Sequence, residues 1–336
     1  IKDVGAEIEN VIGGLVAGGG IAGAVEQALD VSSLETKIDI SFDVPPESVA
    51  AVRDAINTAT AYIEDQEAAI EGVRRQWALN ADASDEANAR IVQGAATISA
   101  AYAGIDFTEL IQEINEIASA LEISDEEALA LTNSLLKAGF PPEQLDIISE
   151  YGLQLQNAGY EAEEIQAIFA AGIDTGTWNI DNLLDGLKEG RIRLAEFGQE
   201  VPESIGELLE GTDISAKQLQ EWGRAVAEGG EAGKQAMREV AEAVNEIDDE
   251  TTKSQLGVAI WGTMYEDQGQ LVIDTILGAK EQVVDLRENQ DQLNESVSQM
   301  ESDPVVQFQQ AMLDLKVALT PLLTTIADII GKFAEW

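Results

Sequence analysis

Apolar residues near the carboxyl end of the chain recur at alternating spacings of three and four, which is the pattern of a helix that keeps one stripe against a neighbouring helix. One run of this pattern covers residues 276–300, with Gln290 as its polar member, and a second covers residues 305–333. We predict that this heptad seam joins copies of the chain. Its residues are Val283, Leu286, Leu293, Val297, Met300, Val305, Phe308, Met312, Leu315, Leu319, Leu322, Ile326, Ile329 and Phe333.

Pro304 separates the two runs. Proline lacks a backbone N–H and is tolerated in the first turn of a helix, so we predict that one helix ends near Glu301 and the next begins at Pro304. A single amphipathic helix often folds back on its own chain, and one run alone does not separate that arrangement from a contact between chains. Two runs in succession favour a bundle of three or more helices, with a homotrimer expected first and a hexamer next.

The first part of the chain is more varied. Residues 11–25 are uncharged and rich in Gly and Ala, but they are too few to cross a bilayer, which takes about 20 residues. Close helix packing and a flexible linker both remain open for this stretch. Residues 37–44 alternate apolar and polar side chains, and this alternation predicts an isolated strand. Beyond it, residues 47–80 are predicted to form one long helix and residues 84–103 another.

Clear helix boundaries follow. Asp106 stands at an N-cap position, Ser124 and Glu127 have the spacing of a capping box, and Gly139 suits the left-handed residue after a helix. The Ala-Gly pair at residues 138–139 is repeated at 158–159 and, more loosely, at 171–172, and each pair is predicted to end a helix. This punctuation indicates a series of short helical hairpins.

These patterns predict an all-α chain in four parts. Residues 1–45 form a Gly/Ala-rich segment with the short strand, and residues 46–104 form long helices. Residues 105–269 form a compact helical-hairpin region. Residues 270–336 form heptad-bearing coiled-coil helices that are broken at Pro304.

Composition narrows the possible functions. The chain has 63 Asp and Glu against 19 Lys and Arg, a formal net charge of −44, so direct nucleic-acid binding is not expected. The sequence contains neither His nor Cys, which excludes Ser-His and Cys-His catalysis and imidazole or thiolate metal sites within this chain. We predict no catalytic residue, no metal and no cofactor, and therefore no enzyme.

Carboxylate pairs are common in so acidic a chain and carry little weight as catalytic candidates. The pairs at residues 163–164, 181 and 185, and 266–267 have spacings that a glycosidase would accept, but two carboxylates catalyse only when their environments separate their pKa values. Solvated helix faces account for them better. Arg191 and Arg193 are expected to pair with Asp185, Glu189 or Glu196 across helix turns.

The segment from Tyr151 to Phe197 carries a family resemblance. A Tyr-containing helix is followed by an Ala-Gly turn, then by a Leu- and Asp-rich stretch from Trp178 that ends in Lys188-Glu189 and Ile192-Arg193. Downstream come the pair Gly229-Gly230 and the turn Trp261-Gly262-Thr263. In this order the motifs resemble tail tape measure proteins of long-tailed bacteriophages and prophages, over roughly residues 121–269. Trp261 stands where Phe is more usual, and the acidic balance leaves the host type open.

The resemblance implies a structural function. A tape measure protein fills the tail tube, sets tail length and leaves during DNA delivery, so the expected location is the virion tail lumen, with the host cytoplasm during assembly. The implied partners are further copies of the chain, the tail tube protein, tail-assembly chaperones and tail-tip or baseplate proteins. Two alternatives stay open: a pore-forming or membrane-active helical protein, and a segment of a peptidoglycan-degrading tail enzyme.

Overall fold

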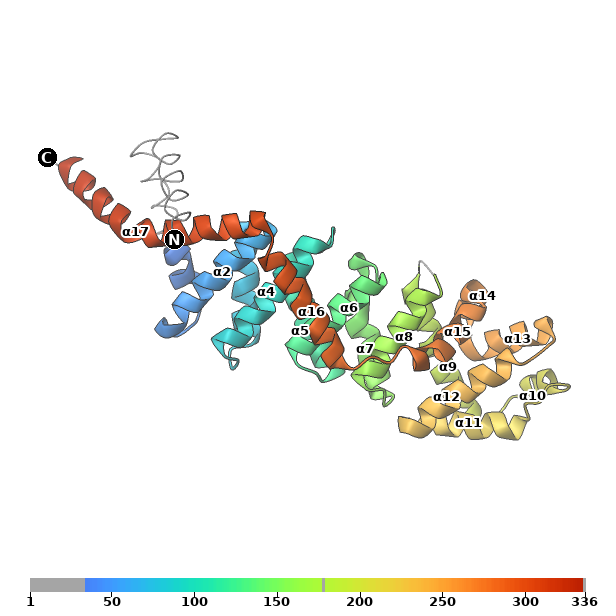
Figure 1. Ribbon diagram of the computed structural model, residues 1–336. Coiled ribbons are helices and arrows are strands. Elements are labelled where there is room, and N and C mark those ends of the chain that lie inside the picture. The colour runs from blue at the N-terminus through green and yellow to red at the C-terminus, as the bar shows by residue number, and fades with distance from the viewer. Residues whose placement is uncertain (1–33, 177–178, 335–336) are drawn as a thin grey trace. The chain divides into compact units, whose positions relative to one another are not determined.

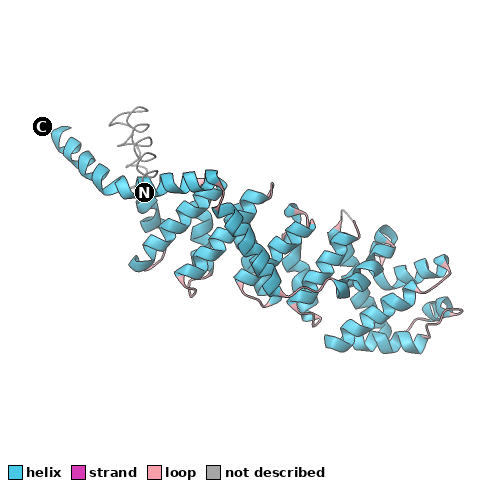
Figure 2. Cartoon of the chain, viewed as in Figure 1, coloured by secondary structure: helices cyan, strands magenta, loops and turns pink. Residues whose placement is uncertain are grey.

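The computed structural model describes residues 34–176 and 179–334, and it shows helices joined by short turns without a β-strand in these ranges (Figures 1 and 2). The predicted all-α class is confirmed. The described chain divides into two compact units. Unit 1 holds residues 34–101, 106–111 and 296–334, and unit 2 holds residues 102–105 and 112–295.

Unit 1 contains helices from both ends of the sequence. It is built from η1 (Pro46–Ser48), α2 (Val49–Ile63), α3 (Gln66–Leu79), α4 (Asp85–Ala101), the start of α5 (Phe107–Leu121), the end of α16 (Leu286–Glu301) and α17 (Pro304–Ala334). Figure 1 shows the first turns of α17 beside α2.

Unit 2 contains the remainder of α5, the first turns of α16 and all the helices that lie between them in the sequence. These are α6 (Asp125–Ala138), η2 (Pro142–Gln144), α7 (Asp146–Asn157), α8 (Ala162–Asp174), α9 (Ile180–Gln199), α10 (Glu203–Leu209), α11 (Ala216–Glu228), α12 (Gly230–Asn245), α13 (Glu250–Trp261), α14 (Thr263–Gln268), α15 (Gln270–Gly278) and η3 (Ala279–Glu281).

The predicted strand at residues 37–44 is wrong, because residues 34–41 form a helix. Ser41 Oγ donates to the Lys37 carbonyl at 2.6 Å, a bond that joins residues one helical turn apart. Leu34 and Ile38, also one turn apart, are 4% and 1% exposed, whereas Ile40 is 81% exposed. A strand would have placed Ile38 and Ile40 on one face. In the helix Leu34 and Ile38 are buried together instead, which stabilises the helix although the sequence alternates.

The predicted single helix over residues 47–80 is divided into α2 and α3. Glu64 adopts a left-handed conformation with φ 58°, and its N–H donates to the Thr60 carbonyl, which ends α2. The carboxylate of Asp65 then accepts from the N–H groups of Glu67 and Ala68, both at 3.0 Å, and starts α3. The N-cap strength of Asp65 explains the break.

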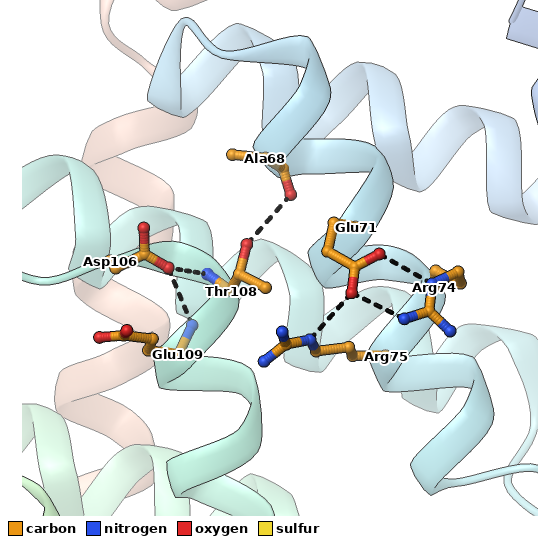
Figure 3. A network of polar contacts seen from close by, with 7 residues as sticks. All are labelled: Ala68, Glu71, Arg74, Arg75, Asp106, Thr108 and Glu109. Atoms are coloured by element: carbon orange, nitrogen blue, oxygen red, sulfur yellow. Dashed lines mark hydrogen bonds and ion pairs between the residues drawn. The ribbon is translucent and has the colours of Figure 1, made fainter.

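The start of α5 lies against α3 (Figure 3). Asp106 caps α5 as predicted, since its carboxylate accepts from the N–H groups of Thr108 and Glu109 at 2.8 and 2.9 Å. The Thr108 hydroxyl donates to the Ala68 carbonyl of α3 at 3.4 Å. A Cβ atom at Gly72 would lie 2.3 Å from the Phe107 ring, so only glycine lets these two helices approach so closely.

Figure 3 also shows a cluster of charges on α3. Glu71 accepts hydrogen bonds from Arg74 at 2.8 and 2.7 Å and from Arg75 at 3.0 Å. The hydrogen bonds from Arg74 are the largest cause that lowers the pKa of Glu71, to about 2. The pairing therefore stays charged in moderately acidic solution.

The predicted helix ends at Ala-Gly pairs are confirmed at two of the three pairs. Ser124 and Glu127 form the predicted capping box, and Gly139 ends α6 with φ 105°. Gly159 likewise has φ 93° between α7 and α8. The pair at residues 171–172 does not end a helix, because α8 continues through Gly172 to Asp174. Here the missing side chain has a packing role: a Cβ atom at Gly172 would lie 3.2 Å from Leu183.

Helices α9 and α11 touch backbone to backbone. A Cβ atom at Gly223 of α11 would lie 2.2 Å from the Leu194 carbonyl oxygen, and one at Gly198 of α9 would lie 2.5 Å from the Gly223 carbonyl carbon. Arg224 Nε donates to the Gly198 carbonyl at 3.1 Å, which fixes the contact. The pair of glycines therefore sets the separation of two helices in unit 2.

Gly223→Ala tests this contact. The added methyl group would clash with the backbone of α9, which cannot move aside as a side chain can. We therefore expect the free energy of unfolding in urea to fall by about 3 kcal/mol. Gly206→Ala in α10 is the matched control, because a Cβ atom there meets nothing within 4 Å. The control should raise stability by about 0.5–1 kcal/mol, since alanine favours a helix over glycine. Equal effects at the two positions would contradict the contact.

Candidate functional site

The upstream run of the heptad seam does not lie on one helix. α15 ends at Gly278, and Val283 lies in the segment between η3 and α16 with its side chain 51% exposed. α16 begins where the Asp285 carboxylate accepts from the Arg287 N–H at 2.8 Å. The low helix propensity of glycine and the cap at Asp285 together interrupt the three-four pattern that the sequence carries across residues 276–300.

The first turns of α16 are covered by helices of unit 2. Asn289 is fully buried and Gln166 of α8 is 3% exposed. Their side-chain amides bond reciprocally, with Asn289 Nδ2 donating to Gln166 Oε1 at 2.6 Å and Gln166 Nε2 donating to Asn289 Oδ1 at 3.2 Å. Gln166 Nε2 also lies 3.2 Å from the Ser134 hydroxyl of α6. This amide contact joins α6, α8 and α16.

The same turns bury two members of the predicted seam. Leu286 is 9% exposed and Leu293 is 3% exposed. Lys137 Nζ of α6 donates to the Gln292 carbonyl at 3.3 Å, on the same part of α16. Leu286 and Leu293 therefore have their apolar contacts within the chain, and the structure leaves them little surface for a second copy.

α17 keeps its seam residues more open. It begins at Pro304 as predicted, with the Asp303 carboxylate accepting from the Val305 N–H at 2.8 Å. Val306 is 6% exposed, whereas Val305 and Phe308 are 58% and 61% exposed.

Polar contacts fix the side of α17 that faces α2. Gln310 Nε2 lies 3.3 Å from the Thr58 hydroxyl, and Gln309 Nε2 donates to Glu64 Oε1 at 3.0 Å. Val305 and Phe308 precede these residues along the helix and are the exposed seam positions among the α17 side chains that the structure describes.

The other seam residues fall into two groups. Four are partly covered: Val297, Met300, Met312 and Leu315. For the remaining five the structure describes the helical backbone but not the side chains: Leu319, Leu322, Ile326, Ile329 and Phe333. The Gly/Ala-rich stretch at residues 11–25 also lies outside the described residues, as does Trp178.

Two of the glycine motifs singled out in the sequence, Ala158-Gly159 and Gly229-Gly230, contact each other. The Gly230 N–H donates to the Ala158 carbonyl at 3.1 Å. A Cβ atom at Gly159 would lie 2.7 Å from the Gly230 Cα atom. The turn between α7 and α8 therefore packs directly on the junction of α11 and α12, which explains the glycine at position 159. At Gly230 a Cβ atom would meet nothing within 4 Å, and its φ of 61° is what favours glycine there.

Two further motifs meet between α9 and α13. The Trp261 ring lies over Gly190, where a Cβ atom would be 2.4 Å from Trp261 Cδ1, and Arg193 lies beside Gly262. Trp261 is fully buried and stacks on Tyr265 with ring centroids 5.6 Å apart. The sequence gives the order of these motifs along the chain. Their contact could not be predicted from it, because the number of residues between two motifs does not determine their distance in the fold. They act as packing elements.

Of the carboxylates that were weighed as catalytic pairs, Asp181 and Asp185 contact other side chains. Asp181 accepts from the Tyr151 hydroxyl at 2.6 Å, and burial is the first cause that raises the Tyr151 pKa. Asp185 lies 3.7 Å from Lys188 Nζ. Glu266 and Asp267 are exposed.

The two arginines at the end of the Leu- and Asp-rich stretch differ. Arg193 pairs with Glu189 at 3.2 Å as predicted, whereas Arg191 donates to the Gln154 carbonyl at 3.3 Å. Over residues 34–176 and 179–334, no cluster of three or more Asp and Glu side chains is placed to hold a metal ion.

Comparison with protein-family models, with curated proteins and with solved structures finds no significant match to the chain. Within the described part of the chain, no helix combines the length and apolar character that a bilayer crossing requires.

Asn289→Ala tests the amide contact that holds α16. The substitution leaves the buried Gln166 amide without its partner, which costs about 1–3 kcal/mol, and the free energy of unfolding should fall by at least that amount. Amide hydrogen exchange should accelerate over residues 286–295. Asn294→Ala, on an exposed position of the same helix, is the control and should change neither measurement appreciably. Unchanged exchange in Asn289→Ala would show that the contact does not hold α16.

Proposed function

We propose that the chain is a structural segment of a tail tape measure protein, which assembles with copies of itself through the heptad seam of α17. The single observation that carries the proposal is the exposure of Val305 and Phe308 at successive seam positions of a 31-residue helix. Large apolar side chains that recur on one stripe of a long helix are typical of a surface that binds another helix.

Three further features support this proposal. The order of motifs over residues 121–269 resembles the tape measure family, and the described chain is helical throughout its ordered elements. A helix converts sequence length into spatial length at about 1.5 Å per residue, which suits a protein that sets the length of a tube. A net charge of −44 would keep such a protein from adhering to DNA that passes through the same tube.

The proposed partners follow from this function. Copies of the chain would pair along α17, with a homotrimer favoured and a hexamer next, and the tail tube protein would surround them. Tail-assembly chaperones and tail-tip or baseplate proteins would bind during assembly. Because Leu286 and Leu293 are buried within unit 2, the contact between copies is proposed for α17 rather than for the whole of residues 276–333.

Phe308→Glu tests the contact between copies. A carboxylate at the centre of an apolar helix interface is costly to bury, so sedimentation equilibrium should show an oligomer for the parent protein and at least a tenfold weaker association for the variant. Gln307→Glu is the matched control: it adds the same charge one residue away, at an exposed position outside the seam. The control should associate like the parent. A parent protein that sediments as a monomer at all concentrations would contradict the proposal.

Tail length tests the proposed function itself. In a phage whose tape measure protein contains this chain, duplication of residues 307–334 keeps the seven-residue period and should lengthen the tail by about 42 Å, given the helical rise per residue. Electron microscopy of assembled tails measures this length. Replacing Gln307 with Glu should leave it unchanged. Tails of normal length after the duplication would refute a length-setting role.

A further inference from the structure

A cavity in unit 2 gathers positive charge that is scarce elsewhere in the chain. Its volume is about 190 Å³, and it lies where α8, α9 and α12 meet residues 276–283. Four of the chain's 19 Lys and Arg residues line it, against one carboxylate, that of Glu164. The four cations are Arg191, Lys234, Arg238 and Lys280.

One of these cations is already neutralised. Lys234 is 8% exposed, and its Nζ lies 2.9 and 2.7 Å from the two Glu164 carboxylate oxygens and 2.9 Å from Glu231. The same Nζ lies 5.7 Å from the centre of the Tyr160 ring, within the range of a cation–π contact. Lys234 therefore pairs with the carboxylate of the cavity wall and with a second one, and these three groups together carry a charge of −1, which the other three cations outweigh.

In the described part of the chain, the other three cations are not engaged in a direct ion pair, although Arg238, after the hydrogen bond and charge of Lys234, also contributes to the lowered pKa of Glu231. Arg191 donates to the Gln154 carbonyl at 3.3 Å and Arg238 to the Gln235 side-chain oxygen at 3.1 Å, and both acceptors are neutral. Among the residues that the structure describes, none of Arg191, Arg238 and Lys280 forms an ion pair with a carboxylate. In a chain this acidic, three cations left unpaired around one cavity give it a net positive charge.

The rest of the cavity wall is apolar. Leu155, Ile168, Leu187, Met237 and Ile276 supply side chains to it. The cavity is smaller than the roughly 300–1,000 Å³ of sites for drug-sized ligands, so a fitting ligand has only a few carbon atoms. The long-range repulsion from the rest of the acidic surface is screened over about 8 Å at physiological ionic strength, so the nearby cations dominate inside the cavity.

We propose that this cavity binds a small amphiphilic carboxylate, whose charged group meets Arg191, Arg238 and Lys280 and whose short carbon chain lies against the apolar wall. Arginine suits such a ligand because its guanidinium group matches the planar geometry of a carboxylate. The proposal goes beyond the structural role of the chain and does not depend on it.

Straight-chain carboxylates of increasing length test the site. The protein is titrated with acetate, butyrate and hexanoate, and the amide signals of Met237 and Lys280 are followed by NMR. Affinity should rise about fourfold for each added methylene until the cavity is filled. Hexanamide, which has a similar shape but no charge, should bind at least tenfold more weakly than hexanoate. Equal binding of acetate and hexanoate would overturn the apolar part of the proposal, and equal binding of hexanamide would overturn the role of the cations.

Two variants locate the binding. Arg238→Gln and Lys280→Gln each remove one positive charge that is in no direct ion pair with a residue the structure describes, and each should weaken hexanoate binding at least tenfold while the thermal melting curve stays unchanged. Lys217→Gln is the control, because Lys217 is 85% exposed on α11 and does not line the cavity. Its affinity should stay within about twofold of the parent protein. Loss of binding in the control alone, or no loss in either cavity variant, would refute the site.

Discussion

The reciprocal amide contact between Gln166 and Asn289 holds the first turns of α16 against unit 2, and the packing of the carboxyl-terminal part depends on it. Two buried amides stabilise a fold only when each satisfies the other, since an unpaired one costs more than the pair contributes. This requirement fixes both the position and the rotation of the first turns of α16 on α6 and α8. With the rotation fixed, Leu286 and Leu293 point into unit 2. The heptad pattern thus serves two purposes: its upstream part packs inside the chain, and its downstream part on α17 leaves apolar side chains exposed.

The sequence predicts several helix ends at which a residue caps its own backbone, although the cap at Asp65 was missed. Asp106, Ser124 and Gly139 act through contacts with residues at most four positions away, so their positions in the chain are sufficient evidence. Pro304 is predictable for the same reason. The helical class also follows from the sequence, because three-four spacing recurs over most of the chain.

Contacts across long separations account for most of the errors, whereas the missed break between α2 and α3 depends on the local cap at Asp65. Residues 37–44 alternate like a strand, yet the chain is helical over residues 34–41, where Leu34 and Ile38 are buried one turn apart. Gly172 resembles a helix end, but the approach of Leu183 explains the glycine without ending the helix. The cavity was missed altogether, because Arg191, Arg238 and Lys280 are far apart in the sequence and belong to different helices. The exposed stripe of α17 was predicted as an apolar stripe, but its division into covered and uncovered residues depends on where α2 lies.

Three pairs of consecutive helices in unit 2 are joined by a single glycine, with φ values of 73° at Gly229, 69° at Gly262 and 57° at Gly269. A junction of one residue cannot absorb an insertion by changing its loop conformation. An inserted residue there would turn the following helix by about 100° about its axis and carry its apolar face away from the core. Evolution can therefore lengthen this region only at its longer turns, such as residues 210–215 between α10 and α11, and the glycine joints should retain a constant length in any descendant of the chain.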